Sequence, residues 1–338
     1  MFAVRPPGMV VIMLAAFVER LGGPEEIRFG ALPEPRPGAS EVLVEVLATT
    51  VNHVDTFIRS GLVPAPVTFP FVLGRDLVGR VAEAGAGAPG IAPGDLVWCN
   101  SLGHGGRQGA AAERVVVPAD RLYPLPPDTD PVDAVAVVHP AATAYLALVT
   151  HGRVRAGETV VVAGAAGNVG SALVELAVEA GAKVIATASG ADLDYCLGLG
   201  AAEAYDYHDP RLPGCLRGAA DLYVDTSGTN DLGAAVGTLA FRGRIVLLAG
   251  ATSRPVLPAG ELYTQDRSIL GFAISNATAA ELADAAVALN RRFASGGLRP
   301  RIVELGRLAE LAEAHRRLER GELRGRRFVL LTDAAGKT

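Results

Sequence analysis

The segment that most constrains the fold is VVVAGAAGNVGSALVELA, where three glycines at 164, 167 and 170 follow an apolar run at 159–163 and lead into a helical pattern at 168–180. Small residues in such a turn let the backbone approach a pyrophosphate, and the start of the helix supplies free N–H groups and a positive dipole end. The glycine spacing alone is weak evidence, but the strand before it and the helix after it strengthen it. We therefore predict dinucleotide contacts from Gly164, Ala165, Ala166, Gly167, Asn168, Val169 and Gly170. The alternative is a tight turn without a ligand.

Alternation of strand, glycine turn and helix continues after about residue 131. Further strands are expected at 183–188, 222–225, 244–249 and 268–274. This alternation predicts a doubly wound parallel sheet, and so an α/β fold. The first 130 residues instead show short apolar runs between Pro/Gly turns, which predicts a mostly antiparallel β-rich domain. A length of 338 residues fits two domains.

Charge and cysteine content narrow the possible partners and the compartment. The formal net charge of −5 argues against a nucleic-acid or anionic membrane surface. The apolar segment 134–149 is shorter than the ~20 residues of a membrane span and is expected to break at His139-Pro140. The three cysteines share no C-x-x-C spacing, so we expect neither a disulfide framework nor a cysteine zinc knuckle, and a reduced, cytoplasmic setting.

The N-terminus allows two interpretations. Arg5 followed by the apolar run 8–18 resembles the core of an export signal. No cleavage site is evident before Glu19, and the run continues into globular sequence. We therefore favour a first strand at 13–18 that follows a loose tail.

The choice between NADH and NADPH depends on the end of the second strand of the nucleotide fold. An acidic residue there would bind the ribose 2′-hydroxyl of NADH. The strand ends Thr187-Ala188-Ser189-Gly190 without an acid, so we predict NADPH, with Ser189 as a donor to the 2′-phosphate. Asp192 would repel that phosphate if it pointed inward, and its alternative role is a solvated charge at a helix N-terminus.

Several ordered motifs together carry a family likeness. These are VNHVDTFIRSG (51–61), LGRDLVGRVAEAG (73–85), PAATAY (140–145) and AGETVVVAGAAGNVG (156–170). With them the chain resembles the medium-chain dehydrogenase/reductase superfamily, and more narrowly its zinc-independent, zeta-crystallin-like NADPH:quinone oxidoreductase branch. The likeness runs from about Met13 to Leu331 and is more specific for the fold than for the substrate.

The resemblance implies a two-domain architecture. A GroES-like catalytic domain would comprise residues 1–136 and 285–338, and a Rossmann nucleotide-binding domain with a six-stranded parallel sheet would comprise 137–284. The reaction site would lie in the cleft between them. Family members commonly form homodimers through the last strand of the nucleotide sheet, here 268–274. Further cofactor contacts are expected from Tyr207, Gly250, Gly271 and Arg326.

The same resemblance allows a test for zinc. Zinc-dependent relatives carry metal ligands at positions that match Asn52, Arg75 and His139, and of these three only His139 could ligate zinc. A catalytic zinc needs three protein ligands and an open position. We therefore predict that the chain uses no metal.

Without a Lewis acid, oxidation of an alcohol is disfavoured, whereas hydride addition to an electrophilic acceptor stays feasible. The expected acceptors are a quinone or an α,β-unsaturated carbonyl: an enone, an alkenal or an enoyl thioester. Asn52 and Arg75 are the candidate donors to the developing oxyanion, with Asp76 behind them and Thr143 near the nicotinamide. Arg75 and Asp76 could instead form an ion pair that only braces the wall of the site.

These observations favour an NADPH-dependent reductase of a small molecule. Two alternatives stay open: a zinc-dependent alcohol dehydrogenase, and a nucleotide-binding structural protein with little turnover. The loop 100–113 departs most from the family, with His104 and Arg107 added among glycines. It could form a wider, more polar substrate pocket or a flexible, solvated loop.

Overall fold

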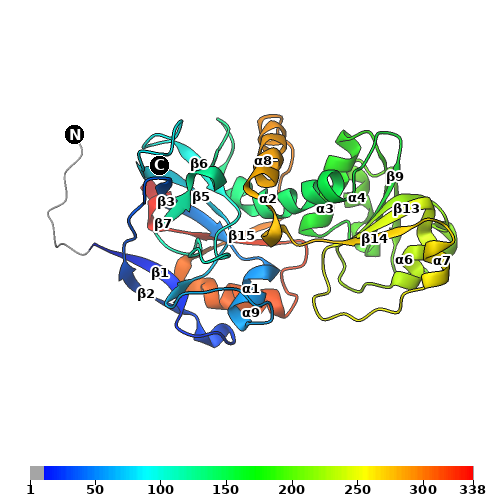
Figure 1. Cartoon of the computed structure of the whole chain (residues 1–338), viewed down its shortest axis with the longest axis horizontal. Coiled ribbons are helices and arrows are strands. Elements are labelled where there is room, and N and C mark those ends of the chain that lie inside the picture. The colour runs from blue at the N-terminus through cyan, green and yellow to red at the C-terminus, as the bar shows by residue number, and fades with distance from the viewer. Residues whose placement is uncertain (1–10, 338) are drawn as a thin grey trace. The chain divides into compact units, whose positions relative to one another are not determined.

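The computed structural model describes residues 11–337, which fall into two compact units. The outer unit joins the segment that ends at His139 to the segment that begins at Asn290, and the inserted unit is Pro140–Leu289 (Figure 1). The sequence placed these two boundaries after residues 136 and 284. The predicted N-terminal tail lies largely outside the described residues.

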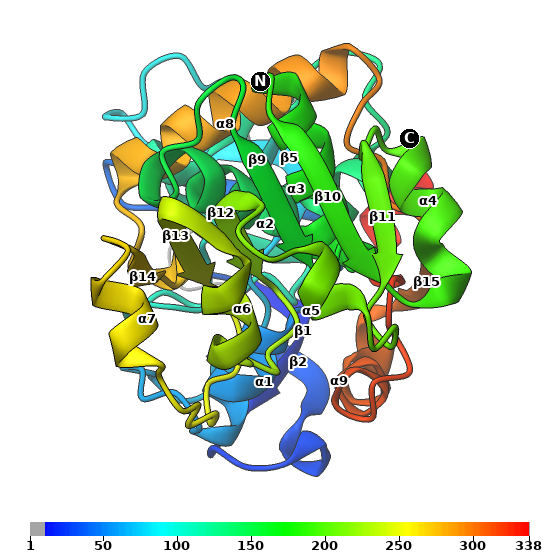
Figure 2. The ribbon, with the colours of Figure 1, turned by 90° about the vertical axis from the view of Figure 1, so that its right-hand side faces the viewer.

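The inserted unit is built on a parallel sheet. Within residues 140–289, all of them described, the sheet has six strands in the order β11-β10-β9-β12-β13-β14 (Figure 2). The strands are β9 (Thr159–Ala163), β10 (Lys183–Ala188), β11 (Glu203–Asp206), β12 (Ala220–Asp225), β13 (Leu239–Leu247) and β14 (Ser268–Gly271). This confirms the predicted doubly wound α/β fold.

The burial of the strands agrees with helices that cover the sheet. The central strand β9 is apolar and almost wholly buried, as expected for a strand covered on both faces. Helix α3 (Asn168–Glu179) packs against β9 and β10, and α6 (Leu232–Thr238) packs against β12 and β13. Shorter helices are α4 (Leu193–Gly198), α5 (Leu212–Cys215) and α7 (Ala259–Tyr263). The last strand, predicted over 268–274, ends at Gly271 in the structure. Ile274 instead begins a 3-10 turn, η5 (Ile274–Asn276).

The outer unit is β-rich and mostly antiparallel. Its larger sheet runs β15-β16-β3-β5-β6-β8, with β7 also paired to β3, and a smaller sheet runs β2-β1-β4. The strands of the larger sheet are β3 (Glu41–Thr50), β5 (Leu77–Ala84), β6 (Leu96–Cys99), β7 (Arg114–Pro118), β8 (Tyr123–Pro124), β15 (Val303–Arg307) and β16 (Arg327–Leu331). Those of the smaller sheet are β1 (Ile12–Val18), β2 (Arg28–Pro33) and β4 (Phe71–Val72).

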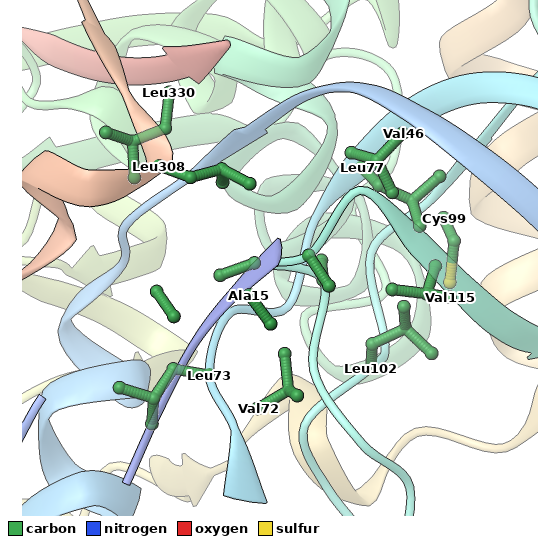
Figure 3. Packing of buried hydrophobic residues seen from close by; sticks show 14 of the residues in the cluster. Ala15, Val46, Val72, Leu73, Leu77, Cys99, Leu102, Val115, Leu308 and Leu330 are labelled. Carbon is green, nitrogen blue, oxygen red and sulfur yellow. The ribbon is translucent and has the colours of Figure 1, made fainter. Parts of the chain in front are cut away.

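Both ends of the described chain contribute to one core in the outer unit. Strand β16 pairs antiparallel with β3, although more than 270 residues separate partners such as Val329 and Thr50. Leu308 and Leu330 join Val46 and Leu77 in the same buried cluster (Figure 3). The outer unit is therefore complete only when its C-terminal segment has returned to β3.

Four helices complete the description of the elements. They are α1 (His53–Ser60), α2 (Pro131–Tyr145), α8 (Ala279–Ala294) and α9 (Leu311–Glu319). The expected break at His139-Pro140 was wrong, because α2 continues through Pro140 and then into the π-helical turn η3 (Leu146–His151). A proline removes one hydrogen bond from a helix, and the burial of this apolar segment offsets that loss.

The helical stretch 131–151 is long and apolar enough, by length and composition, to cross a membrane. However, 72% of its most apolar window is buried inside the structure. Core helices of folded domains pass the same test. The stretch is therefore explained as a core helix.

Helix α3 offers a test of this packing. Leu173 is fully buried against the sheet, whereas Val178, on the same helix, is 39% exposed. We expect Leu173→Ala to lower the free energy of unfolding by about 2–5 kcal/mol and Val178→Ala to lower it by less than about 1 kcal/mol. Urea unfolding curves of the two variants measure this, and equal losses would contradict the assignment of the buried face.

Candidate functional site

A buried polar cluster in the outer unit surrounds Asp76, just before β5. Asp76 has no solvent exposure. Its Oδ2 accepts hydrogen bonds from Asn52 Nδ2 at 2.7 Å and from the Thr50 hydroxyl at 3.1 Å. Its Oδ1 lies 3.4 Å from Nδ1 of His139. The carboxylate therefore connects the end of β3, the start of α1 and the middle of α2.

Asn52 is held in place by the local sequence. It is the N-cap of α1, and its backbone N–H donates to Oδ2 of Asp55 at 2.7 Å in a capping box. A side chain capable of capping, followed three residues later by an acid, is the pattern that favours this geometry. With its backbone fixed by this cap, Asn52 directs its side-chain amide at Asp76. The sequence predicts these two residues in the same site.

Arg327, the first residue of β16, completes the cluster and was missed from the sequence. Its Nη2 donates to the Thr50 hydroxyl at 2.6 Å and to Oδ1 of Asn52 at 3.0 Å, and it lies 3.8 Å from Oδ2 of Asp76. The adjacent Arg326 is the residue predicted from the sequence to contact the cofactor. That side chain is exposed and forms an ion pair with Glu304 at 3.0 Å. Adjacent residues at a strand start point to opposite faces, but the sequence does not show which of the two arginines turns inward.

Arg75 and Asp55 complete the charge distribution of the cluster. Arg75 is 1% exposed, and burial lowers the pKa of its guanidinium, while Asp55 and Asp76 oppose that shift. Burial, and then repulsion from Asp76, raises the pKa of Asp55 to about 6. Arg75 interacts electrostatically with both carboxylates, so it braces the cluster and also holds positive charge there. Both roles predicted for it are compatible with this geometry.

Thr143 is the remaining residue of the predicted catalytic set. It lies on α2 in the inserted unit and is buried. Asn52, Arg75 and Asp76 belong to the outer unit. The structure therefore brings the latter three together, and Thr143 belongs to the other half of the predicted site.

The residues of this cluster do not fit a catalytic zinc. Asn52 and Arg75 offer an amide and a guanidinium where two ligands would be needed, and His139 lies against the Asp76 carboxylate. Across residues 11–337, no group of three or more His, Cys, Asp or Glu side chains is arranged to hold a metal ion.

The glycine turn of the inserted unit fits a dinucleotide. Gly164 has a φ of +79°, and a Cβ on Gly170 would lie 2.1 Å from the Gly164 carbonyl oxygen, so only glycine permits this approach. Gly167 is the N-cap of α3. The N-terminus of a helix directs backbone N–H groups and the positive end of its dipole toward an anion, so the start of α3 fits a pyrophosphate.

Four further predicted cofactor residues also lie in the inserted unit. Gly250 has a φ of +86° and packs against Asn230, whose Nδ2 would lie 2.1 Å from an added Cβ. Gly271 ends β14, and Tyr207, which follows β11, is half exposed. The hydroxyl of Ser189 donates to Oδ2 of Asp192 at 2.6 Å. Ser189, which was predicted to donate to the 2′-phosphate of NADPH, thus donates to the Asp192 carboxylate instead. This bond is an argument against the predicted role of Ser189.

The divergent loop 100–113 is tied down in the structure. Arg107 donates from Nε and Nη2 to the carbonyl of Ser101, at 3.2 and 3.1 Å. The Gln108 side chain accepts from the Val72 N–H at 2.7 Å and donates to the carbonyls of Thr68 and Pro70. These bonds argue against the flexible loop that was one of the two interpretations.

The raised pKa of Asp55 predicts a pH dependence of stability. The folded protein holds this proton up to about pH 6, whereas the unfolded chain loses it near pH 4, so stability falls between these values as pH rises. A shift of about two pKa units corresponds to a loss of about 3 kcal/mol. We expect Asp55→Asn, which keeps an acceptor for the Asn52 N–H, to lack this loss.

Urea unfolding of both proteins from pH 4 to pH 7 measures the difference. The exposed Asp194→Asn provides a control with the same change of charge. Parallel stability curves for the wild type and Asp55→Asn would show that the Asp55 carboxyl titrates normally.

Comparison with known proteins places both units in one family. The alcohol dehydrogenase GroES-like domain family matches residues 38–127, and the zinc-binding dehydrogenase family matches residues 168–289. Human quinone oxidoreductase is 28% identical over 95% of this chain and 98% of its own length, and the rat protein is 30% identical over 90% and 93%.

Solved structures agree with these matches. A mycobacterial quinone oxidoreductase superposes with a TM-score of 0.82 at 28% identity and covers 95% of this chain and 100% of its own. A protein described as an NAD-dependent alcohol dehydrogenase superposes with a TM-score of 0.85 at 32% identity, with the same coverage. A further mycobacterial structure, with a TM-score of 0.82, is a complex with NADPH.

The two family matches occur in the order of the two units, and the relatives span nearly the whole chain. A GroES-like domain and a Rossmann domain are thereby confirmed, and the chain is an oxidoreductase of nicotinamide-dependent type. It belongs to the medium-chain dehydrogenase/reductase superfamily, in its quinone oxidoreductase branch.

Proposed function

We propose that this protein is a zinc-independent reductase that transfers hydride from a nicotinamide dinucleotide to a quinone or an α,β-unsaturated carbonyl. One observation carries the proposal: two buried arginines, Arg75 and Arg327, share a cluster with Asn52 and Asp76 at positions that cannot form a zinc site. This cluster offers fixed positive charge and hydrogen-bond donors without a Lewis acid.

The nucleotide side of the reaction belongs to the inserted unit. When bound, the nicotinamide dinucleotide supplies the hydride. The turn from Gly164 to Gly170 would hold its pyrophosphate, because its three glycines place no side chain between the backbone and the phosphates. Thr143, buried on α2, is the residue of this unit proposed to lie beside the nicotinamide.

The acceptor side belongs to the outer unit. Hydride addition to a quinone or an enone places negative charge on an oxygen, and prearranged donors in a low-dielectric site stabilise such charge without reorganising. Arg75 is held by the two carboxylates, and Nε of Arg327 has no hydrogen-bond acceptor within residues 11–337. We propose that these cations stabilise the developing oxyanion while Asp76 keeps Asn52 in place.

The acceptor class follows from this chemistry. Quinones, enones, alkenals and enoyl thioesters already have an electrophilic carbon, so they need no metal to polarise them. The names of the human and rat relatives support a quinone. They leave the form of the cofactor open, since similar structures include an NAD-dependent protein and a complex with NADPH. NADPH remains the prediction from the sequence.

The proposal is tested by following the oxidation of NADH and NADPH with a panel of para- and ortho-quinones, 2-alkenals, enones and enoyl thioesters. We expect turnover with at least one class, no loss of rate with a zinc chelator, and no stoichiometric zinc by metal analysis. Arg75→Met should lower kcat/KM by about 100-fold or more, as removal of an oxyanion donor does.

The exposed Arg324→Met is the matched control and should retain activity. Circular dichroism and Tm must show that Arg75→Met is folded. Absence of turnover with every acceptor would instead favour the nucleotide-binding structural protein, and stoichiometric zinc needed for alcohol oxidation would favour the alcohol dehydrogenase.

We further propose that the protein forms a homodimer through β14. This strand is at the edge of the parallel sheet, and Leu270 on it and Tyr263 close before it are exposed. An apolar edge strand presents unpaired N–H and C=O groups to another chain, and pairing with a second copy would satisfy them.

Leu270→Glu should convert the dimer to a monomer, because it places a charge on the proposed interface. Leu305→Glu is the matched control, since Leu305 is an exposed leucine on the edge strand β15 of the outer unit. Sedimentation velocity measures the oligomeric state of both variants. A dimer that survives Leu270→Glu but dissociates with Leu305→Glu would contradict the proposal and place the interface at β15 of the outer unit.

A further inference from the structure

We infer that the adenosine ribose site is built for a 2′-hydroxyl, so that this chain uses NADH in preference to NADPH. The residues that make this choice are Asp192 and Asp206. The inference rests on the proposed nicotinamide-dependent function and reverses the cofactor expected from the sequence.

The first carboxylate is fixed at the end of β10. Ser189 directly follows this strand, and its hydroxyl donates to Oδ2 of Asp192 at 2.6 Å. The backbone N–H of Asp192 in turn donates to the Ser189 carbonyl at 2.9 Å. These two bonds hold Asp192 against the strand end, so it is not a solvated charge that points away. The Ser189 hydroxyl already donates its hydrogen to Asp192, so it has none to donate to a ligand. A ligand at this turn therefore meets the Asp192 carboxylate as an acceptor.

The second carboxylate comes from the neighbouring strand. Asp206 is the last residue of β11 and lies opposite Ala188 in the parallel register. Its Oδ2 lies 2.7 Å from the position of a Cβ on Gly190, and its Oδ1 accepts the His208 N–H at 2.9 Å. Asp206 thus lies against the same turn as Asp192, although 14 positions separate them in the sequence.

The lysine and the arginine nearest in sequence to the Ser189 turn each pair with another carboxylate. Lys183 lies at the opposite end of β10 and forms an ion pair with Glu203 at 2.6 Å. Arg211 forms an ion pair with Asp209 at 2.8 Å. Both cations are therefore paired with carboxylates other than Asp192 and Asp206.

The chemistry of the two cofactors differs only at this site. A 2′-phosphate carries between one and two negative charges at neutral pH and would face both carboxylates. A 2′-hydroxyl instead donates a hydrogen bond to a carboxylate, and such charge-assisted bonds are the stronger kind. The same two residues therefore attract one cofactor and repel the other.

Binding measurements separate this inference from the reaction itself. Calorimetric titration with NAD⁺, NADP⁺, 5′-AMP and adenosine 2′,5′-bisphosphate needs no acceptor and no turnover. We expect the wild type to bind NAD⁺ at least about tenfold more tightly than NADP⁺, which is about 1.4 kcal/mol. The bisphosphate should likewise bind more weakly than 5′-AMP.

Variants then identify the residues. Asp192→Asn and Asp206→Asn should each reduce the preference for NAD⁺, and the double variant should bring it to parity or reverse it. Asp194→Asn is the matched control, because Asp194 is exposed two residues from Asp192 and should leave the preference unchanged. Circular dichroism and Tm establish that each variant is folded.

The outcomes are distinct. Tighter binding of NADP⁺ by the wild type, or a preference that the double variant leaves unchanged, would overturn this inference alone. Failure of every nucleotide to bind would overturn it together with the proposed function.

Discussion

Burial of one carboxylate, that of Asp76, sets the conditions for the rest of the outer unit. A charge without solvent contact is tolerated only where hydrogen bonds and opposite charges replace water. Thr50 and Asn52 donate to Asp76, His139 lies beside it, and the guanidinium of Arg327 is close to it. These partners come from β3, α1, α2 and β16, so a change in any of these elements leaves a buried charge uncompensated. The cluster therefore couples distant parts of the chain more tightly than apolar packing alone would.

The same constraint shapes the chemistry. A cluster that holds two arginines and two carboxylates out of water has a fixed pattern of charge, and it cannot adapt to a metal ion without losing partners. In the proposed reaction, its oriented donors would stabilise negative charge on an acceptor oxygen. Asn52 and Arg75 thus bring an amide and a guanidinium to the cluster, neither of which is a usual zinc ligand.

Local patterns in the sequence predicted what depends on local physics. The G-x-x-G-x-x-G turn, the strands on either side of it and the doubly wound sheet followed from spacing and periodicity. The positions of Asn52, Arg75 and Asp76 came from motif resemblance, and the structure brings these side chains together. What could not be predicted depends on contacts between distant segments. Arg327 meets Asn52 across 275 positions, and no local signal shows which of two adjacent arginines turns inward.

The cofactor end of the inserted unit shows the same limit. In the sequence the tip of β10 carries Ser189 and no acid, whereas in the structure the Ser189 hydroxyl donates to an acid, Asp192, from the next turn. Asp206 reaches the same place from another strand, which only the parallel register between β10 and β11 reveals. In the helix α2, the rule that proline ends a helix failed because tertiary burial outweighs a single lost hydrogen bond.

The nesting of one unit inside the other has a consequence for biosynthesis. Residues 140–289 form a continuous segment, so the inserted unit can complete its sheet as soon as it leaves the ribosome. Strand β3 emerges much earlier, yet its partner β16 follows the whole inserted unit in the sequence. Until then an edge of β3 and the apolar residues that meet Leu308 and Leu330 lack their cover. The nascent outer unit therefore carries an exposed strand edge while the whole inserted unit is made, and such an edge can pair with another chain and aggregate.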